Sequence, residues 1–259
     1  MKVHSGDPVV NVRDLRKIYT LGEAQVVALA GIDLQIDRGE FVAVMGPSGS
    51  GKSTFMQITG LLDNPTSGEY RFEGQDVSHL DADARADIRS RRLGFVFQSY
   101  NLLPRTSALE NVELPMVYAG VPEAQRKQIA LEKMKIVGVD HLADHAPNQM
   151  SGGQQQRVAI ARSLVNNPGL ILADEPTGAL DTKTSEDVMR IFKELNEEQG
   201  ITIMLVTHEP DIAAHAKRVV TFRDGCVVSD ASLDKLGMTE GKLGMTEGKL
   251  AMTEREVVA

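Results

Sequence analysis

The sequence has few of the features that mark secreted or membrane-spanning proteins. Its single cysteine, Cys226, excludes a disulfide framework within one chain and fits a reducing compartment. Its apolar runs, such as Phe41–Gly46, are far shorter than the roughly 20 residues that span a bilayer. The first ten residues, MKVHSGDPVV, contain no apolar segment of the kind that a signal peptide needs. We therefore expect a cytoplasmic chain that reaches a membrane only through a partner.

An excess of positive charge is also missing. The chain has 28 Lys and Arg against 36 Asp and Glu, a net charge of −8, which argues against broad, charge-driven binding of nucleic acid. The basic run Arg89–Arg92 is better explained as the solvated end of a helix. The 259 residues are 42% hydrophobic and 25% charged, as in ordinary globular proteins. This length predicts one or two domains with a self-sufficient core.

Short apolar runs alternate with helix-like segments along most of the chain, which predicts an α/β protein with a partly parallel sheet. Four of these runs predict buried strands: Phe41–Met45, Leu93–Phe97, Leu170–Ala173 and Ile201–Val206. Each leads into a polar or glycine-rich segment, and such strand exits are where open α/β sheets place their ligands. Nearer the N-terminus, apolar positions alternate with polar ones at Val26, Ala28, Leu34 and Ile36. This alternation predicts an antiparallel edge or a small antiparallel side sheet.

The middle of the chain, about residues 99–165, has a different pattern. Prolines punctuate its helix-like stretches, at Pro104, Pro115, Pro122 and Pro147. One such stretch, Glu123–Val137, carries apolar residues among Lys and Glu. We expect a helical subdomain inserted between two strands of the main sheet. The predicted organisation is an N-terminal extension (1–8), one main domain (9–230) and a C-terminal tail (231–259).

The tail contains a sequence repeat with a period of seven. LGMTEGK occurs at Leu236–Lys242 and again at Leu243–Lys249, and LAMTERE follows at Leu250–Glu256. A heptad suggests a coiled coil, but its Leu and Met are two positions apart rather than three or four. The repeated glycines also penalise a helix by about 1 kcal/mol each. We expect a flexible or weakly ordered tail, with a short partner-binding strip as the alternative.

A phosphate-binding motif follows the first predicted strand. It reads Gly46, Pro47, Ser48, Gly49, Ser50, Gly51, Lys52, Ser53, Thr54. The first eight residues match G-x-x-x-x-G-K-[ST], and a helix-like segment, 53–62, comes next, as this motif requires. The glycines let backbone N–H groups point at phosphate oxygens, and the helix adds its positive end. Lys52 can bridge the β- and γ-phosphates of a nucleotide and the Ser53 hydroxyl can bind Mg²⁺, whereas a chance Gly/Ser-rich turn would lack this strand–loop–helix context.

Two acidic residues follow the strand Leu170–Ala173. Asp174 can hold Mg²⁺ directly or through water, and Glu175 can act as the general base for the water that attacks the γ-phosphate. An isolated Asp-Glu pair more often begins a surface loop. Directly after a buried strand in a chain with a phosphate loop, the catalytic interpretation is favoured.

At residues 9–230 the chain resembles the nucleotide-binding subunits of ABC transporters. The most specific element is the ABC signature, Ser151, Gly152, Gly153, Gln154 and Gln155, here preceded by Met150 where Leu is commoner. Ser151 suits the N-cap of a helix that runs to Val165, and the N–H groups of that helix offer a second anion site. The resemblance implies an α/β fold with a P-loop NTPase (RecA-like) core, an antiparallel β side sheet and an inserted α-helical subdomain. It also implies that each signature closes over the γ-phosphate of the opposite subunit, so that ATP draws two chains into a head-to-tail homodimer.

The resemblance assigns further roles to residues outside these motifs. Tyr19 would stack on the adenine, and Gln98 would contact Mg²⁺ and the attacking water. His208 would contact the γ-phosphate, although a lone histidine is more often structural. The segment 178–181 (GALD) resembles the loop that links the two sites and ends at Asp181, with Gly178 where Ser is often found. The implied cofactors are ATP and Mg²⁺, with the metal held by Ser53, Gln98 and Asp174.

Several segments are similar to one branch of the family, the lipoprotein-releasing and macrolide-export type. They include Phe95–Pro104, Glu110–Pro115 and Ala173–Asp181. Members of this branch pair with four-helix membrane permeases that carry a large periplasmic domain. The resemblance therefore implies a chain held on the inner face of the cell membrane by such a permease, with no nucleic-acid partner.

The same resemblance places the docking surface for the membrane subunit between Gln98 and Pro115. Tyr100, Leu102 and Leu103 fit that role if they are exposed, but the two leucines suit a core almost equally well.

Two functions remain open: a motor that drives the membrane subunit, and a regulatory ABC ATPase that controls a membrane scaffold, such as an activator of cell-wall hydrolases, without transport. A soluble DNA-repair ATPase is disfavoured by the negative charge and by the lack of a long coiled-coil insertion before the signature.

Overall fold

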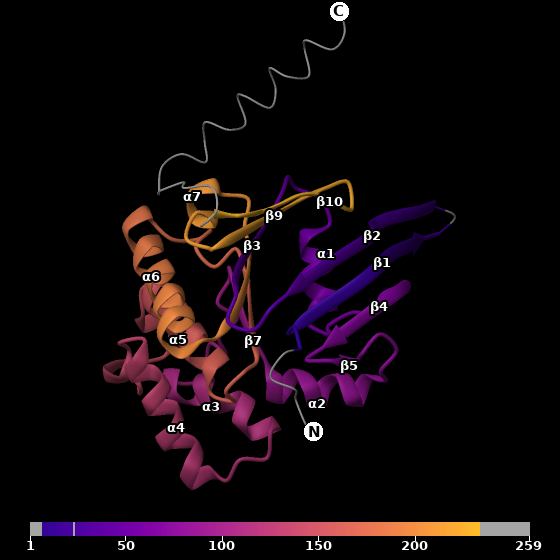
Figure 1. Ribbon diagram of the computed structural model, residues 1–259. Helices are drawn as coiled ribbons and strands as arrows, with labels where there is room; N and C mark the ends of the chain where they lie inside the picture. Colours follow the sequence, from indigo (N-terminus) through magenta and orange to yellow (C-terminus); the bar gives the residue numbers. More distant parts are fainter. Residues whose placement is uncertain (1–6, 23, 234–259) are drawn as a thin grey trace, which may run out of the picture.

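A six-stranded sheet forms the centre of the computed structural model, which describes residues 7–22 and 24–233 (Figure 1). Its strand order is β10 (Cys226–Ser232), β9 (Arg218–Arg223), β3 (Phe41–Met45), β8 (Thr202–Val206), β7 (Leu170–Asp174) and β6 (Leu93–Phe97). Strands β9, β3, β8, β7 and β6 are parallel, and β10 pairs antiparallel with β9. The four predicted apolar strands are thus confirmed. The predicted bounds differ in two places, because β7 extends through Asp174 and β8 begins at Thr202 rather than Ile201.

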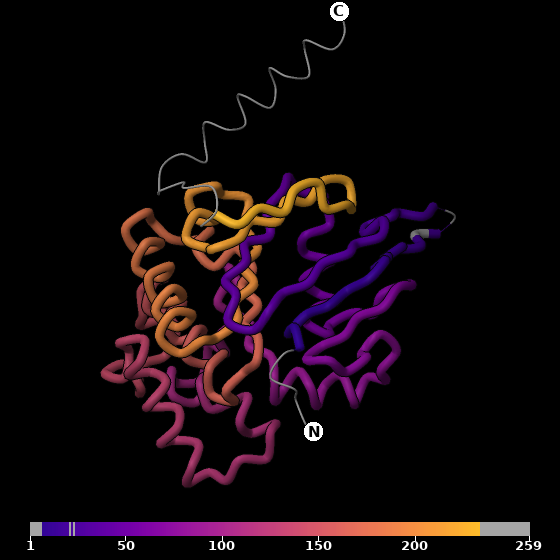
Figure 2. Tube along the Cα trace, in the orientation of Figure 1, coloured from indigo at the N-terminus to yellow at the C-terminus, as the bar shows by residue number. Residues whose placement is uncertain are grey.

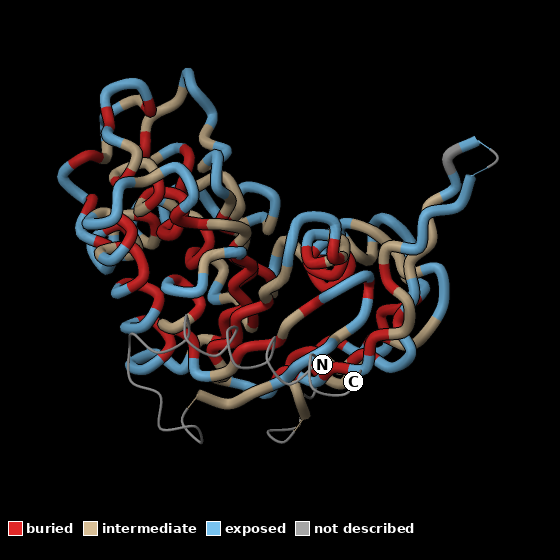
Figure 3. Tube along the Cα trace, turned by 90° about the horizontal axis from the view of Figure 1, so that it is seen from above, coloured by how far each residue is buried: buried red, intermediate tan, exposed pale blue. Residues whose placement is uncertain are grey.

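A second sheet is antiparallel, as the alternating pattern predicts. Its order is β2 (Ala24–Ile36), β1 (Val10–Leu21), β4 (Ser67–Phe72) and β5 (Gln75–Asp76). Leu34 and Ile36 are buried. Val26 is 48% exposed and Ala28 only half-buried, so the apolar positions of this strand are not all part of the core. The reason is that the hairpin of β1 and β2 extends beyond the body of the molecule (Figure 3).

The helical segment expected between two strands of the main sheet lies between β6 and β7. It contains α3 (Ala108–Tyr118), α4 (Glu123–Ile136), the 3₁₀ turns η1 (Asp140–Leu142) and η2 (Pro147–Gln149), and α5 (Gly152–Leu164). Helix α4 ends one residue before the predicted Val137. Pro115 lies inside α3 instead of ending it. The bounds predicted for the domains themselves remain a prediction.

The other helices are α1 (Lys52–Thr59), α2 (Ala82–Arg92), α6 (Thr182–Gln199) and the short α7 (Pro210–Ala213). The helix predicted at 53–62 begins one residue earlier and ends at Thr59. Gly60 follows it, and a Cβ atom there would lie 2.9 Å from the Leu172 side chain. The helix therefore ends where the chain approaches the main sheet most closely.

The main sheet separates two hydrophobic clusters. Along β3, Phe41 and Ala43 face the cluster that includes α3, α5 and α6, whereas Val42 and Val44 face the cluster shared with α1 and the side sheet. Figure 1 shows these two layers on opposite sides of β3 and β7, and Figure 2 shows the chain passing from β2 into β3. The carboxyl ends of the parallel strands remain open to loops, where sequence motifs place the site.

No helix among residues 7–22 and 24–233 is long and apolar enough to cross a membrane. The heptad repeat of the tail, residues 236–256, lies outside the described residues.

Candidate nucleotide site

The phosphate loop connects β3 to α1, and its three glycines all have positive φ. The angles are +146° at Gly46, +79° at Gly49 and +102° at Gly51. At Gly46 a side chain would collide with the Phe222 carbonyl oxygen, and a Cβ atom at Gly51 would lie 2.6 Å from the Ala28 carbonyl oxygen. Glycine is therefore required here both by backbone conformation and by the close approach of β2 and β9.

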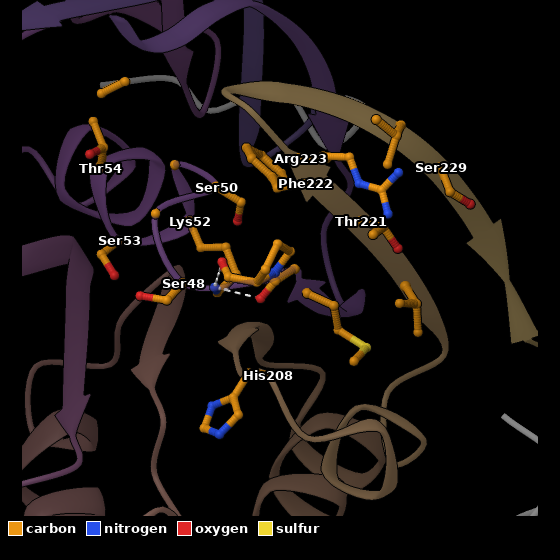
Figure 4. Close-up of a pocket in the computed structure, with 18 of the residues that line it drawn as sticks. Ser48, Ser50, Lys52, Ser53, Thr54, His208, Thr221, Phe222, Arg223 and Ser229 are labelled. Atoms are coloured by element: carbon orange, nitrogen blue, oxygen red, sulfur yellow. Dashed lines mark hydrogen bonds between the residues drawn. The ribbon is translucent and has the colours of Figure 1, made fainter. Parts of the chain in front are cut away.

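The ammonium group of Lys52 lies inside the loop. It donates hydrogen bonds to the carbonyl oxygens of Gly46 (2.7 Å) and Pro47 (2.9 Å), drawn as dashed lines in Figure 4. Burial lowers the pKa of Lys52, and the negative charges of Glu175 and Asp174 oppose this effect. The phosphate loop and the acidic end of β7 are therefore close enough to influence each other electrostatically.

A cavity of about 1210 Å³ opens beside the loop. The predicted site residues in its wall are Gly46, Pro47, Ser48, Gly49, Ser50, Gly51, Lys52, Ser53, Thr54, Glu175 and His208. In Figure 4, His208 lies across the cavity from Ser50 and Phe222. This volume exceeds the roughly 300–1,000 Å³ of common ligand sites, so the cavity can accommodate a nucleoside triphosphate.

The other predicted residues lie outside this wall in the described chain: Tyr19, Gln98, Ser151, Gly152, Gly153, Gln154, Asp174 and Asp181.

The ends of strands β7 and β8 place Glu175 at the cavity, with Asp174 beside it at the end of β7. Asp174 pairs in register with Val206, so these two strands end at the same level. Glu175 follows with φ +43°, and its N–H donates to the Val206 carbonyl at 2.8 Å. The left-handed turn lets Glu175 enter the cavity wall while Asp174 stays at the strand end.

Glu175 and His208 form a pair. The His208 Nδ1 atom lies 2.8 Å from Glu175 Oε1. The His208 side chain is 59% exposed and the Glu175 side chain is 26% exposed. The two residues follow β7 and β8, neighbouring parallel strands, which explains their proximity. A carboxylate held in this way has its orientation fixed by the imidazole while one oxygen remains available.

Asp174 is half-buried. Burial raises its pKa, the neighbouring Glu175 charge raises it further, and Lys52 opposes both. The exposed Ser53 hydroxyl is in the first turn of α1. Hydroxyl and carboxylate oxygens are ligands that Mg²⁺ prefers, so the chemistry of these side chains fits this metal.

Tyr19 is fixed on the side sheet, in β1. Its hydroxyl donates to Asp63 Oδ2 at 3.0 Å, and the Lys17 ammonium lies 4.9 Å from the centre of its ring. Burial and the Asp63 bond raise the Tyr19 pKa, and the Thr54 hydroxyl lowers it. Tyr19 is therefore near the helix that follows the phosphate loop, although it does not line the cavity.

The signature begins α5, and the predicted N-cap is confirmed. The Gln154 N–H donates to Ser151 Oγ (3.3 Å), while the Ser151 N–H donates to Gln154 Oε1 (2.8 Å). None of the signature residues lines the described wall of the cavity. The signature of the chain therefore lies outside the wall of the cavity that its own phosphate loop lines.

Gln98 and the loop at 178–181 contact each other. Gln98 follows β6, and a Cβ atom at Gly178 would lie only 2.6 Å from its Nε2 atom. Asp181 caps α6 by accepting from the Thr184 N–H (3.1 Å) and hydroxyl (2.6 Å), and these bonds lower its pKa. The glycine that replaces the usual serine therefore lets the glutamine side chain pack against this loop.

Comparisons with known proteins show the family to which the chain belongs. A sequence profile of the family described as "ABC transporter" matches residues 29–178. The chain belongs to the ABC transporter family. Among its relatives, this ABC domain is 52% identical over 224 residues to the uncharacterized ABC transporter ATP-binding protein YknY of Bacillus subtilis. That alignment covers 86% of this chain and 97% of the relative.

Other relatives of the ABC domain are longer. It is 55% identical over 221 residues to the macrolide export ATP-binding/permease protein MacB of Syntrophobacter fumaroxidans, covering 85% of this chain. The aligned part is 31% of that protein, so this chain spans about a third of its length. In the relative, as its name states, an ATP-binding part and a permease belong to one protein.

Solved structures also match the ABC domain. A dimeric post-hydrolysis state of the ATP-binding cassette MJ0796, bound to ADP and Pi, is 46% identical with a TM-score of 0.79. The match covers 86% of this chain and 98% of that chain. The protein cbiO1 of Clostridium perfringens, part of the ABC transporter complex cbiONQ, matches at 30% identity with the same TM-score. The chain is therefore an ABC-type ATP-binding domain with the α/β fold of these cassettes.

Sequence reasoning missed part of the cavity wall. Val26 and Val27 of β2, together with Thr221 and Arg223 of β9, line it (Figure 4). The only local signal is the Asp224-Gly225 turn, whose Gly225 N–H donates to the Ser50 carbonyl at 3.1 Å. A turn motif does not reveal which distant loop it contacts. The sequence around Gly225 therefore could not place these four residues in the cavity wall.

Proposed function

We propose that this ABC domain binds and hydrolyses ATP with Mg²⁺, as one half of a two-fold dimer that drives a separate membrane subunit. The observation that carries the proposal is the placement of the phosphate loop, Glu175 and His208 around one cavity, whose wall does not include Ser151 of the same chain. Two chains arranged head to tail would complete two sites. The dimeric form of a cassette that is 46% identical supports this arrangement.

In the proposed site, the loop N–H groups and Lys52 bind the β- and γ-phosphates. Ser53, Asp174 and Gln98 hold Mg²⁺, which neutralises phosphate charge when bound. Lys52 already donates to two carbonyl oxygens, so it exchanges these bonds for phosphate oxygens. The platform for the adenine is Tyr19, whose ring is held by Asp63 and Lys17.

Hydrolysis then depends on the pair Glu175 and His208. Glu175 accepts a proton from the attacking water, and His208 orients this carboxylate through Nδ1. The Nε2 atom of His208 is left to contact the γ-phosphate. Ser151 and Gln154 from the opposite chain bind the far side of that phosphate at the N-terminus of α5.

The proposed membrane partner is a permease, of the four-helix type with a large periplasmic domain, that holds the ABC domain on the inner face of the membrane. The relatives named MacB, in which the two parts belong to one protein, support this pairing. The exposed residues Leu103, Val117 and Tyr118 supply an apolar surface for it, whereas Leu102 packs against the core. Of the two leucines, only Leu103 is thus available for docking.

The variant Glu175→Gln tests the hydrolytic role. It keeps the size of the side chain but removes the base, so we expect turnover at least about 100-fold slower with ATP binding retained. Because ATP is bound and not consumed, gel filtration with Mg²⁺ and ATP should show a persistent dimer.

The matched control is Glu198→Gln, an exposed position in α6, which should keep turnover within about twofold of wild type. Near-normal hydrolysis by Glu175→Gln would refute the assignment of the base.

A further inference from the structure

The segment after Gln98 contains two consecutive residues, neither of them glycine, in left-handed backbone conformation. The φ angles are +59° at Tyr100 and +50° at Asn101. Each such residue costs of order 1 kcal/mol, so the conformation persists only where its surroundings hold it. The loop that begins with Gln98 therefore needs an external support.

Arg162 of α5 supplies that support. Its Nη2 atom donates to the Tyr100 carbonyl at 2.8 Å, and its Nη1 atom donates to the Asn101 carbonyl at 2.6 Å. No carboxylate in the described part of the chain lies within ion-pair distance of this guanidinium. The rigid, planar guanidinium of Arg162 thus binds the carbonyl groups of both residues that have left-handed backbone conformation.

Tyr100 also touches the opposite end of α5. A Cβ atom at Gly152 would lie 2.7 Å from the Tyr100 hydroxyl oxygen. Gly152 and Arg162 are ten residues apart on the helix, a rise of about 15 Å. The loop is consequently attached to the signature helix near its beginning, by a side chain, and near its end, by backbone carbonyls.

We propose that Arg162 is a positioning residue for Gln98, which it holds in a fixed relation to the signature helix. This inference rests on the proposed function, in which Gln98 contacts Mg²⁺ and the attacking water.

A double-mutant cycle in the full chain tests the inference. The variants are Arg162→Met, which keeps the volume without the donors, Gln98→Ala, and the two combined. We expect Arg162→Met to lower kcat about tenfold or more while the KM for ATP stays within about twofold, because positioning is lost and nucleotide binding is not. If Arg162 acts through Gln98, the double variant should be no slower than Gln98→Ala.

Arg162→Lys provides a second variant for the same cycle, because an ammonium keeps the charge but cannot bind both carbonyls as a fork. The surface arginine Arg190, replaced by Met, is the matched control and should leave kcat within about twofold. Thermal unfolding of each variant identifies those that fold.

Multiplicative losses in the double variant would overturn the role of Arg162 while leaving the ATPase proposal standing. A normal kcat in Gln98→Ala would instead overturn the role of Gln98 and, with it, this inference.

Discussion

The carboxylate of Asp174 lies half-buried at the end of β7, next to a second carboxylate, Glu175. Burial and this neighbour raise its pKa, although Lys52 opposes them. A raised pKa means that the folded chain takes up a proton at Asp174 at a higher pH than an ordinary aspartate does. Mg²⁺ binds the ionised carboxylate, whereas burial in the folded chain favours the neutral carboxyl group.

The raised pKa of Asp174 predicts how Asp174→Asn changes the stability of the fold. In EDTA at pH 7 the variant should unfold at a higher temperature than wild type, because an ionised group whose folded pKa is raised destabilises the fold above that pKa. The difference should shrink as the pH is lowered and wild-type Asp174 becomes neutral. Scanning calorimetry at pH 5 and pH 7 measures both effects.

The same substitution should weaken Mg²⁺-dependent nucleotide binding, measured by calorimetric titration. The control is Asp144→Asn, an exposed aspartate outside the phosphate loop, the signature and the end of β7. If Asp174→Asn is less stable than wild type in EDTA at pH 7, this result contradicts the electrostatic explanation.

At the scale of residues, the phosphate loop and Asp174-Glu175 could be predicted because each is a local pattern beside an apolar strand. The contact between Glu175 and His208 could not, since the two residues are far apart in sequence and only strand pairing brings them together. The Lys52 bonds to loop carbonyls likewise depend on the exact curl of the loop.

At the scale of elements, helix α3 depends on one buried polar side chain, Asn111. Its amide accepts from the Leu103 N–H (2.7 Å) and donates to Thr106 Oγ1 (2.8 Å) and to the Ser107 carbonyl (2.9 Å). It also donates to the Leu103 carbonyl at 3.2 Å. One asparagine thus fixes the turn by which the chain enters the helix.

Replacing Asn111 by Ala should lower the free energy of unfolding by about 2–3 kcal/mol, because the loop N–H group loses its partner in a buried place. Urea unfolding measures the loss. Asn148→Ala, at an exposed position in η2, should change it by less than about 0.5 kcal/mol. Equal effects of the two substitutions would mean that Asn111 has no special part in the helix entry.

Element boundaries were predictable where composition changes abruptly. Phe41–Met45 and Leu93–Phe97 are strands with the expected ends, since a glycine follows the first and a charged helix end precedes the second. Pro115 lies inside α3 rather than at its end, because a helix can continue past a proline when tertiary packing supports it. Alternation in β2 revealed a strand but not how far the core extends along it, so the exposure of Val26 was missed.

At the scale of the whole molecule, three large apolar side chains before α3 and at its C-terminal end are exposed in the described chain. Leu103, Val117 and Tyr118 are 45%, 48% and 76% exposed. Buried aromatic side chains dominate the energetics of many interfaces, so Tyr118 is the strongest candidate anchor for the proposed permease.

Tyr118→Asp should reduce the amount of integral membrane protein that co-purifies with the tagged chain by at least about tenfold, a loss of about 1.4 kcal/mol or more. Quantitative mass spectrometry of solubilised membranes measures it. Ile136→Asp, at an exposed apolar residue of α4, is the matched control and should retain the partner. Equal recovery with both variants would place the docking surface elsewhere.

The position of β3 has a consequence for how the protein is made. Val42 pairs with Met204 of β8 on one side and with Arg218 of β9 on the other, and the Gly225 N–H binds the phosphate loop at Ser50. During synthesis the phosphate loop emerges before the two strands that flank β3 and before the turn at Gly225. The contacts that support the loop can therefore form only after β8, β9 and this turn have been synthesised.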